Sequence, residues 1–401
     1  MAAMASPIFT PGRIGPLTLR NRTIRAAAFE GMSPGGRPSE SLERYHASVA
    51  EGGVGMSTVA YVSVQPNGRG FDHQMWMHPD IVPGLRRITD AVHRGGAAAS
   101  VQLGHCGNMA DSGVTGERLV APSSVFNLFG LALPRALRTW EIDGLVDAFA
   151  VSVRLAGEAG FDAVEIQAGH GYLLSQFLSP YTNRRKDRWG GSFENRSRIL
   201  RDVMAGVRKA AGGAMAVVVK MNLRDGFEGG MELDEAVEVA RLLEQEGADA
   251  LVLSGGFVSK CPWYVMRGEI PLKDLIDSHP DPIRKAGLFL FGRFFVKPFP
   301  FEEAYFLEDA LVVRRAVRLP LVLVGGLRSL KKMEEVMSAG MEFIALGRPL
   351  IIEPDFVSRL QRGEQQVSRC EPCNKCIAAM YRNEMVCPLA VPDGPSAPQS
   401  K

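Results

Sequence analysis

Short apolar runs alternate with longer amphipathic stretches along this 401-residue chain, and this alternation constrains its fold more than any other feature. The runs predict eight strands, at residues 23–28, 55–61, 98–103, 163–168, 216–221, 250–254, 321–325 and 343–347. Between them lie helical patterns, such as Val146, Phe149, Val153 and Ala156, and Ala236, Ala240 and Leu243 before Gly247. Because strand–helix alternation joins parallel strands by crossovers, we expect strands that are buried on both faces.

Eight strand–helix units predict an α/β protein with a (β/α)₈ TIM barrel. A doubly wound sheet is the alternative, but it usually carries G-x-G-x-x-G after its first strand, and the sequence holds no such motif. Two connections, 104–139 and 256–318, exceed ordinary crossovers, and loops of that size usually carry function. We therefore divide the chain into a barrel over 1–365, with an insertion at 256–318, and a cysteine-containing tail at 366–401.

Charge and hydropathy exclude several classes of partner. The chain has 46 Lys plus Arg against 44 Asp plus Glu, a formal charge of +2, which argues against nucleic-acid binding through bulk electrostatics. No run approaches the roughly 20 apolar residues of a membrane-spanning helix. The first residues lack the basic and then apolar pattern of a signal peptide. We expect a cytoplasmic protein that acts on a small molecule.

The ends of the seventh and eighth predicted strands carry a phosphate-binding pattern. In a TIM barrel the chemistry lies at the C-terminal ends of the strands. Gly325-Gly326 and Gly347-Arg348 follow those two strands, and there backbone amides and a guanidinium can bind a phosphate. The alternative is that these glycines only end strands.

The fourth predicted strand ends in a cluster of polar side chains. Gln167, His170 and Tyr172 lie within six residues of one another. An imidazole N–H can polarise a carbonyl group, and a phenol can deliver a proton to carbon near neutral pH. A buried structural His–Tyr pair is the alternative reading.

Several ordered segments between residues 6 and 360 resemble the old yellow enzyme family. They are Asn21-Arg22, Gln102-Leu103-Gly104-His105, the segment 160–166, the segment 170–174, the segment 176–180 and the segment 183–198. The resemblance implies an FMN-dependent reductase on a (β/α)₈ barrel. In such enzymes NADH or NADPH reduces FMN, and the C=C bond of an α,β-unsaturated carbonyl compound is reduced in turn.

The resemblance also implies residue roles. His170 would hold the substrate carbonyl oxygen, and Tyr172 would protonate the α-carbon. Gln167 stands where the family has a substrate-binding histidine, Lys220 where it usually has an arginine, and Ala27-Ala28 where it has Pro-Met. The residues implied around FMN are Ala27, Ala28, Ala60, Gln102, Lys220, Gly325, Gly326, Gly347 and Arg348.

The tail contains Cys370, Cys373 and Cys376, separated by two residues each, followed by Cys387. Four thiolates so spaced can bind an iron–sulfur cluster or a zinc ion, and the tail without metal is the third reading. The segment resembles the cluster region of the dienoyl-CoA reductase and trimethylamine dehydrogenase branch, which implies a 4Fe-4S cluster. Alternative functions are therefore an amine dehydrogenase or a dienoyl-thioester reductase, and also a flavin-binding protein without turnover.

The insertion is rich in aromatic residues. We expect Trp263 and Tyr264 to contact substrate, and the run 288–295 to help form a wall for a bulky apolar enone. The alternative is that the same surface forms a subunit interface in a homo-oligomer.

Overall fold

The predicted barrel is present in the computed structural model, which describes residues 6–390 except 129, 280, 296 and 383. Its parallel strands close in the order β10-β11-β12-β3-β4-β5-β8-β9. They are β3 (Thr23–Arg25), β4 (Met56–Ser63), β5 (Ala98–Gly104), β8 (Ala163–Ala168), β9 (Ala216–Asn222), β10 (Ala250–Ser254), β11 (Leu321–Val324) and β12 (Phe343–Leu346). All eight predicted strands form, and closure excludes the doubly wound sheet.

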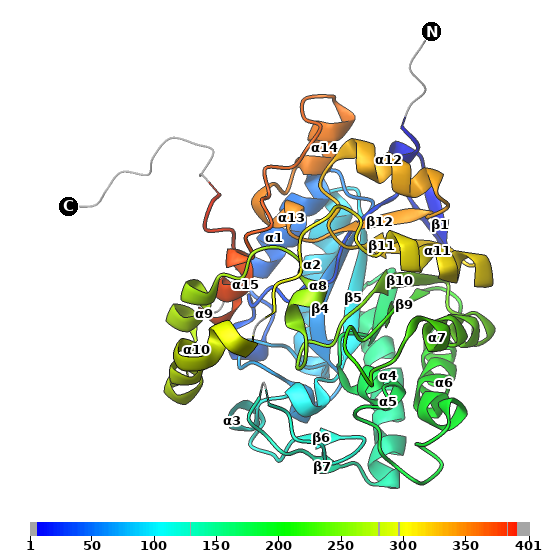
Figure 1. Cartoon of the computed structure of the whole chain (residues 1–401). Coiled ribbons are helices and arrows are strands. Elements are labelled where there is room, and N and C mark those ends of the chain that lie inside the picture. Colours follow the sequence, from blue (N-terminus) through cyan, green and yellow to red (C-terminus); the bar gives the residue numbers. More distant parts are fainter. Residues whose placement is uncertain (1–5, 129, 280, 296, 383, 391–401) are drawn as a thin grey trace.

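Helices surround the barrel, as Figure 1 shows. They are α1 (Glu40–Glu51), α2 (Val82–Arg94), α4 (Thr139–Glu158), α6 (Phe193–Ala211), α7 (Leu233–Gln245), α11 (Leu307–Ala316), α12 (Leu330–Ser338), α13 (Pro349–Ile352) and α14 (Phe356–Gln361). The predicted helical pattern is confirmed in α4, where Phe149, Val153 and Ala156 are fully buried against the barrel. Gly247, with φ +79°, follows α7 as expected, because a left-handed residue ends a helix readily when it is glycine.

The N-terminal end of the barrel is closed by a small hairpin. Strands β1 (Gly12–Ile14) and β2 (Leu17–Leu19) pair antiparallel, and Ile14 and Leu19 join an apolar cluster with Ile24, Val218 and Phe343. This packing leaves the C-terminal ends of the strands as the end at which a site can form.

Short elements complete the connections. The 104–139 connection contains α3 (Ser112–Thr115) and the paired strands β6 (Val120–Ala121) and β7 (Arg135–Ala136), while α5 (Leu173–Leu178) follows β8. The 3-10 helices are η1 (Pro7–Phe9), η2 (Pro34–Gly36), η3 (Pro66–Gly68), η4 (Pro79–Ile81), η5 (Gly107–Met109) and η6 (Met380–Arg382). No helix among the described residues has the length and apolar character needed to cross a bilayer.

The insertion contains α8 (Pro262–Val265), α9 (Leu272–Ser278) and α10 (Pro282–Phe295). Its last part, α11, packs on α7 and so serves as a barrel helix. Helices α9 and α10 stand away from the barrel at the lower left of Figure 1. On α10, Phe289 is 74% exposed and Leu290 61% exposed. The side chains of Phe291, Phe294 and Phe295, which the sequence analysis placed in the same apolar surface, lie outside the described set.

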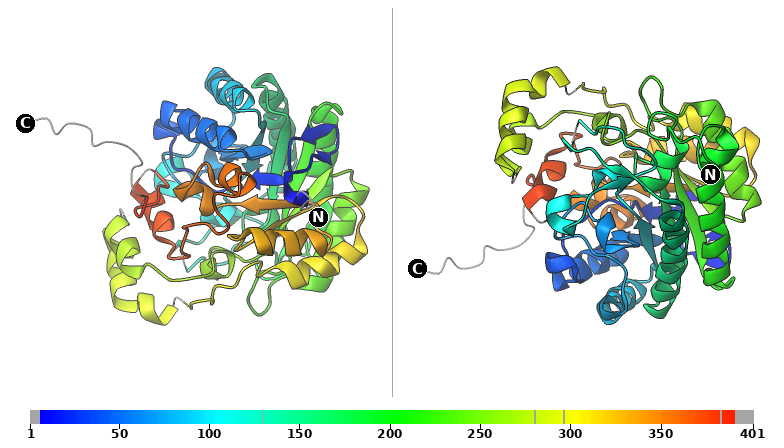
Figure 2. Two further views of the ribbon diagram at one scale, coloured as in Figure 1. Left: turned by 90° about the horizontal axis from the view of Figure 1, so that it is seen from above. Right: turned by 90° about the horizontal axis from the view of Figure 1, so that it is seen from below.

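The cysteine-containing tail packs on the barrel. Its helix α15 (Lys375–Ala379) lies beside α9, as Figures 1 and 2 show. The Met385 N–H donates to the Glu30 carbonyl at 2.7 Å, and a His73 ring nitrogen lies 3.0 Å from the Met380 carbonyl oxygen. The tail therefore covers the region that follows β3 and β4. Residues 391–401 lie outside the described residues.

Candidate active site

A buried polar layer crosses the C-terminal half of three neighbouring strands. Parallel register places Gln102 of β5 opposite Glu165 of β8, and Gln167 of β8 opposite Lys220 of β9. Lys220 Nζ lies 2.8 Å from Glu165 Oε1, and both side chains are almost fully buried. Gln102 Nε2 donates to Glu165 Oε1 at 2.6 Å, and Gln167 Nε2 donates to Gln102 Oε1 at 3.4 Å. A buried charge needs such a partner, so the layer fixes one ammonium and two amides in place.

The Lys220 ammonium also donates to the carbonyl of Ala27 at 3.2 Å. Ala27 follows β3, so this bond ties the first strand end to β9. Ala60 lies within β4 and is buried, and its N–H donates to the Glu30 carboxylate at 3.0 Å. The resemblance implies Ala27, Ala28 and Ala60 around a cofactor. The backbone of each forms a hydrogen bond with a buried charged side chain: Lys220, Arg25 and Glu30 respectively.

His170 occupies a left-handed backbone conformation, with φ +60°, directly after β8. Such a conformation is costly for a residue with a β-carbon and tends to persist at functional sites. The His170 N–H donates to Asn222 Oδ1 at 2.8 Å, and His170 Nε2 lies 2.7 Å from Ser254 Oγ. Burial, assisted by the Lys220 charge, lowers the pKa of His170 to about 3. The imidazole is neutral at physiological pH.

Tyr172 lies in a second group of side chains, together with Tyr61 and Cys106. The Tyr61 and Tyr172 ring centroids are 5.1 Å apart, and Tyr61 Oη lies 2.7 Å from Cys106 Sγ. Burial raises the pKa of Tyr172 well above its usual value, and it raises the pKa of Cys106 to about 12. All three groups keep their protons near neutral pH. The sequence analysis gave Tyr61 and Cys106 no role. Tyr61 lies in the C-terminal half of β4, and Cys106 follows β5 by two residues.

The predicted phosphate-binding pattern brings together loops from three strand ends. Gly325 and Gly326 both have positive φ, +135° and +73°. A β-carbon on Gly347 would meet no heavy atom within 4 Å, so open space lies beside it. Arg348 Nη1 donates to Asn374 Oδ1 at 2.6 Å and to the Arg267 carbonyl at 3.0 Å.

Arg267 is a cation of this region that sequence reasoning missed. Its guanidinium lies over the rings of Tyr305, Phe306 and Tyr264 at 4.6, 5.6 and 5.0 Å. A β-carbon on Gly325 would lie 2.8 Å from Phe306, which places these rings against the glycine loop. Arg267 Nε is buried and has no hydrogen-bond partner among the described residues. An unpaired buried donor fits an oxygen of a phosphate, and the buried amides and ammonium fit the polar edge of a flavin ring. The residues present therefore fit FMN.

Trp263 and Tyr264 lie in α8 of the insertion. Trp263 is buried, and Tyr264 packs on Phe299 and Phe306 with centroids 5.3 and 5.7 Å away. The Arg267 guanidinium contacts the rings of both Tyr264 and Tyr305, and Tyr305 packs on the glycines that follow β11. A role of these two aromatic residues in substrate binding stays a prediction.

The four tail cysteines line one cavity. Cys370, Cys373, Cys376 and Cys387 share it with Arg348 and Asn374. Among the described residues, no group of three His, Cys, Asp or Glu side chains is arranged to hold a single metal ion. Binding of a cluster or of zinc by these cysteines stays a prediction.

Aromatic side chains join the tail to the loops that follow β3 and β4. Phe29 stacks on Phe71 at 4.9 Å, and Phe71 contacts Tyr381 of η6 at 5.7 Å. Tyr381 also contributes to raising the pKa of Tyr172. The tail is therefore part of the surroundings of the site, which the sequence analysis did not predict.

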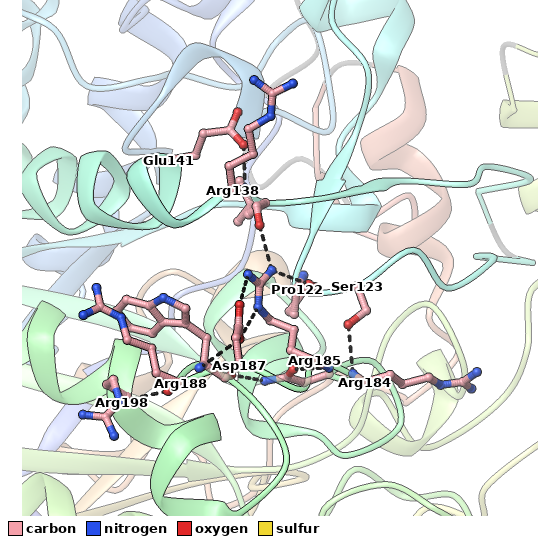
Figure 3. A network of polar contacts seen from close by, with 12 residues as sticks. Pro122, Ser123, Arg138, Glu141, Arg184, Arg185, Asp187, Arg188 and Arg198 are labelled. Atoms are coloured by element: carbon pink, nitrogen blue, oxygen red, sulfur yellow. Dashed lines mark hydrogen bonds and ion pairs between the residues drawn. The ribbon is translucent and has the colours of Figure 1, made fainter.

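The segment 183–198 is held against the 104–139 connection by a polar network, shown in Figure 3. Arg185 donates to the carbonyls of Pro122 and Leu137 at 2.9 and 2.7 Å and pairs with Asp187 at 2.6 Å. The Arg184 N–H donates to Ser123 Oγ at 2.9 Å. These contacts fix the loop that follows α5 next to the catalytic end of β8.

Comparisons with known proteins identify the family of this chain. The model of the NADH:flavin oxidoreductase / NADH oxidase family matches residues 7–259. The chain is 42% identical over 375 residues to a 4,4′-dithiodibutanoate disulfide reductase of Rhodococcus erythropolis, with 93% of each chain covered.

Two solved structures share the fold. A 2-naphthoyl-CoA reductase complex superposes with a TM-score of 0.84 at 23% identity; the match covers 97% of this chain and 57% of that one. An old yellow enzyme homologue of Zymomonas mobilis superposes with a TM-score of 0.74 at 25% identity, covering 97% of this chain and 99% of that one.

Proposed function

The chain belongs to the NADH:flavin oxidoreductase / NADH oxidase family, and from that premise we propose that it is an FMN-dependent ene-reductase acting on α,β-unsaturated carbonyl compounds. The observation that carries the proposal is that a neutral imidazole, His170, and a protonated phenol, Tyr172, both follow β8 two residues apart, each buried and held by its own contacts. Bound FMN would supply a hydride taken from NADH or NADPH. The family match confirms the resemblance seen in the sequence.

Each residue of the site has a distinct task in this proposal. Gln102 and Lys220 would hold the polar edge of the flavin ring, while the glycines after β11 and β12, with Arg348 and Arg267, would hold its phosphate. His170 would bind the substrate carbonyl oxygen, oriented by Asn222 and Ser254. Tyr172 would deliver a proton to the α-carbon, since burial keeps its phenol protonated.

Reduction of organic disulfides is the second candidate function. The relative that is 42% identical over almost its full length is named for that activity. The same site supports it, because a phenol that protonates carbon can also protonate a leaving thiolate.

A spectrophotometric experiment separates the candidates. We expect a yellow protein whose flavin bands are bleached by NADH or NADPH without oxygen and restored by 2-cyclohexenone. Restoration by 4,4′-dithiodibutanoate but not by the enone would favour the disulfide reductase. Bleaching by NADH or NADPH with no restoration by enones, disulfides or dienoyl thioesters, together with no bleaching of the oxidised flavin by trimethylamine-type amines, would favour a flavin-binding protein without turnover. A protein that takes up no FMN would contradict the proposal.

We further propose that the four tail cysteines bind a 4Fe-4S cluster. Anaerobically purified protein should contain about four iron atoms and four acid-labile sulfides per chain. The Cys376→Ser variant should lose most of this iron, because one ligand is removed. The Cys261→Ser variant, which changes a cysteine outside the tail, should keep the iron. Stoichiometric zinc without sulfide, or protein free of metal, would contradict this assignment.

Because His170 is buried and neutral, we predict that the stability of the protein depends on pH. The pKa of His170 is about 3 in the folded protein, against about 6.5 for an unfolded chain, so between these values only the unfolded state binds the proton. Stability should therefore fall as the pH decreases from about 6.5 toward 3, by up to about 1.4 kcal/mol per pH unit from this group. Urea unfolding at pH 7 and pH 5 should show a smaller difference for His170→Gln than for the wild type. An identical difference would contradict the buried, neutral assignment.

A further inference from the structure

Two exposed cations flank a single tyrosine ring at the catalytic end of the barrel. The Arg184 guanidinium lies 5.7 Å from the Tyr181 ring centroid, and Lys260 Nζ lies 4.8 Å from it. Arg184 Nε donates to the Tyr181 carbonyl at 3.2 Å, and Lys260 Nζ donates to the Tyr181 hydroxyl at 3.3 Å. One ring from the loop after α5 thus fixes two cations from different loops. We call Arg184, Lys260 and Tyr181 the cationic rim.

The rim differs from the other arginines of the segment 183–198 because it has no anionic partner among the described residues. The other arginines of the same segment form ion pairs: Arg185 with Asp187, Arg188 with Asp143, Arg196 with Glu235 and Arg198 with Glu194. Among the described residues, neither Arg184 nor Lys260 pairs with a carboxylate. In Figure 3 the Arg184 guanidinium points away from the Arg185–Asp187 network. Two exposed cations that contact one ring and have no counter-charge among the described residues are suited to an anion from outside.

Aromatic rings connect the rim to the reacting groups. Phe257 packs on Gly171, the residue between His170 and Tyr172, where a β-carbon would lie 2.5 Å from the ring. From there Phe257 contacts Phe227 at 5.6 Å, and Phe227 contacts Tyr181 at 5.1 Å.

The backbone makes a second connection. The Val258 N–H donates to the His170 carbonyl at 3.0 Å, and Lys260 follows two residues later. The rim therefore stands a few side chains away from the site and is anchored to the same strand end as His170.

We propose that Arg184 and Lys260 bind the carboxylate of an acidic substrate whose reacting group lies at His170 and Tyr172. The inference rests on the proposed function and names its substrate class: an organic acid in which several carbon atoms separate the carboxylate from the reducible bond. A guanidinium can bind both oxygens of one carboxylate, and an ammonium that contacts the same tyrosine adds a second attractive charge. The bond to Tyr181 orients both cations before the substrate arrives, which reduces the entropy lost on binding.

The test compares an acid with its neutral ester. The double variant Arg184→Gln/Lys260→Gln should raise KM for 4,4′-dithiodibutanoate about tenfold or more, and change KM for its dimethyl ester and for 2-cyclohexenone less than about twofold. Added NaCl should raise KM of the wild type for the acid but not for the ester, because salt screens exposed charges. Arg188→Gln removes one positive charge from the same segment and serves as the matched control. It should change none of these values.

A binding experiment makes the result independent of turnover. Decanedioate is a non-reducible analogue of 4,4′-dithiodibutanoate with the same number of chain atoms. Its Kd, measured by calorimetry on the FMN-loaded protein, should rise about tenfold in the double variant and stay unchanged in Arg188→Gln. Equal Kd values in wild type and double variant, or equal effects on acid and ester, would overturn the proposal. A rise in KM for NADH alone would also overturn it and assign the rim to the dinucleotide phosphates.

Different measurements test the proposed function and the carboxylate site at the rim. If the proposed function is wrong, flavin reduction by NADH or turnover of neutral substrates is absent, while decanedioate binding still responds to the rim. If only the assignment of the rim is wrong, the double variant still turns over both kinds of substrate, and its KM values for the acid and for the ester change by the same factor.

Discussion

The Tyr172→Phe variant should reduce enones with a kcat about two to four orders of magnitude below that of the wild type. The phenol is the proton donor in the proposed reaction, and burial keeps it protonated and close to Tyr61 and Cys106. Removing only the hydroxyl leaves the ring packing in place. Reduction of the flavin by NADH should change little, because that half of the reaction needs no proton from Tyr172. Anaerobic stopped-flow measurements of the two half-reactions test this difference.

Tyr61→Phe provides the matched control for this prediction. It makes the same chemical change in a neighbouring ring, whose hydroxyl bonds Cys106. We expect a rate within about tenfold of the wild type, since one hydrogen bond is lost and no proton donor is removed. The assignment of Tyr172 fails if the two variants are equally slow, or if Tyr172→Phe slows flavin reduction as much as enone reduction.

Lys220→Met should destabilise the protein by about 3–5 kcal/mol at pH 7 and abolish flavin binding. The ammonium and the Glu165 carboxylate are both almost fully buried and lie 2.8 Å apart. Removing the cation therefore leaves a buried carboxylate whose remaining hydrogen-bond donor among the described residues is Gln102. Urea unfolding and the flavin absorbance of purified protein measure the two effects.

Two further variants separate charge burial from cofactor binding. The double variant Lys220→Met/Glu165→Gln removes both charges and should recover most of the lost stability, but no flavin, because the cation beside the cofactor is still missing. Lys220→Arg should keep flavin, since a cation remains at the position where the related family usually has an arginine. Full flavin binding by Lys220→Met would show that the ammonium has no contact with the cofactor.

The residues of the candidate site could be predicted to lie together because the C-terminal ends of all strands in a (β/α)₈ barrel lie at the same face. Gln102, Gln167, His170, Tyr172 and Lys220 all occupy or follow the ends of predicted strands. Since parallel strands of one barrel direct these ends to the same face, the chemistry at each end indicates a shared site. The pairing of Gln102 with Glu165, and of Gln167 with Lys220, then follows from strand register.

The sequence by itself determined the eight strands, the pattern of the α4 helix and the end of the α7 helix at Gly247, because these depend on local periodicity and backbone preference. Only the tertiary structure decided which distant residues meet. The tail covers the β3 and β4 loops, Arg348 bonds Asn374, Arg267 lies on the Tyr305 and Phe306 rings, and Arg184 and Lys260 share Tyr181. Such contacts join irregular loops that have no periodicity to read, so their partners are selected by packing and charge once the barrel has brought the loops together.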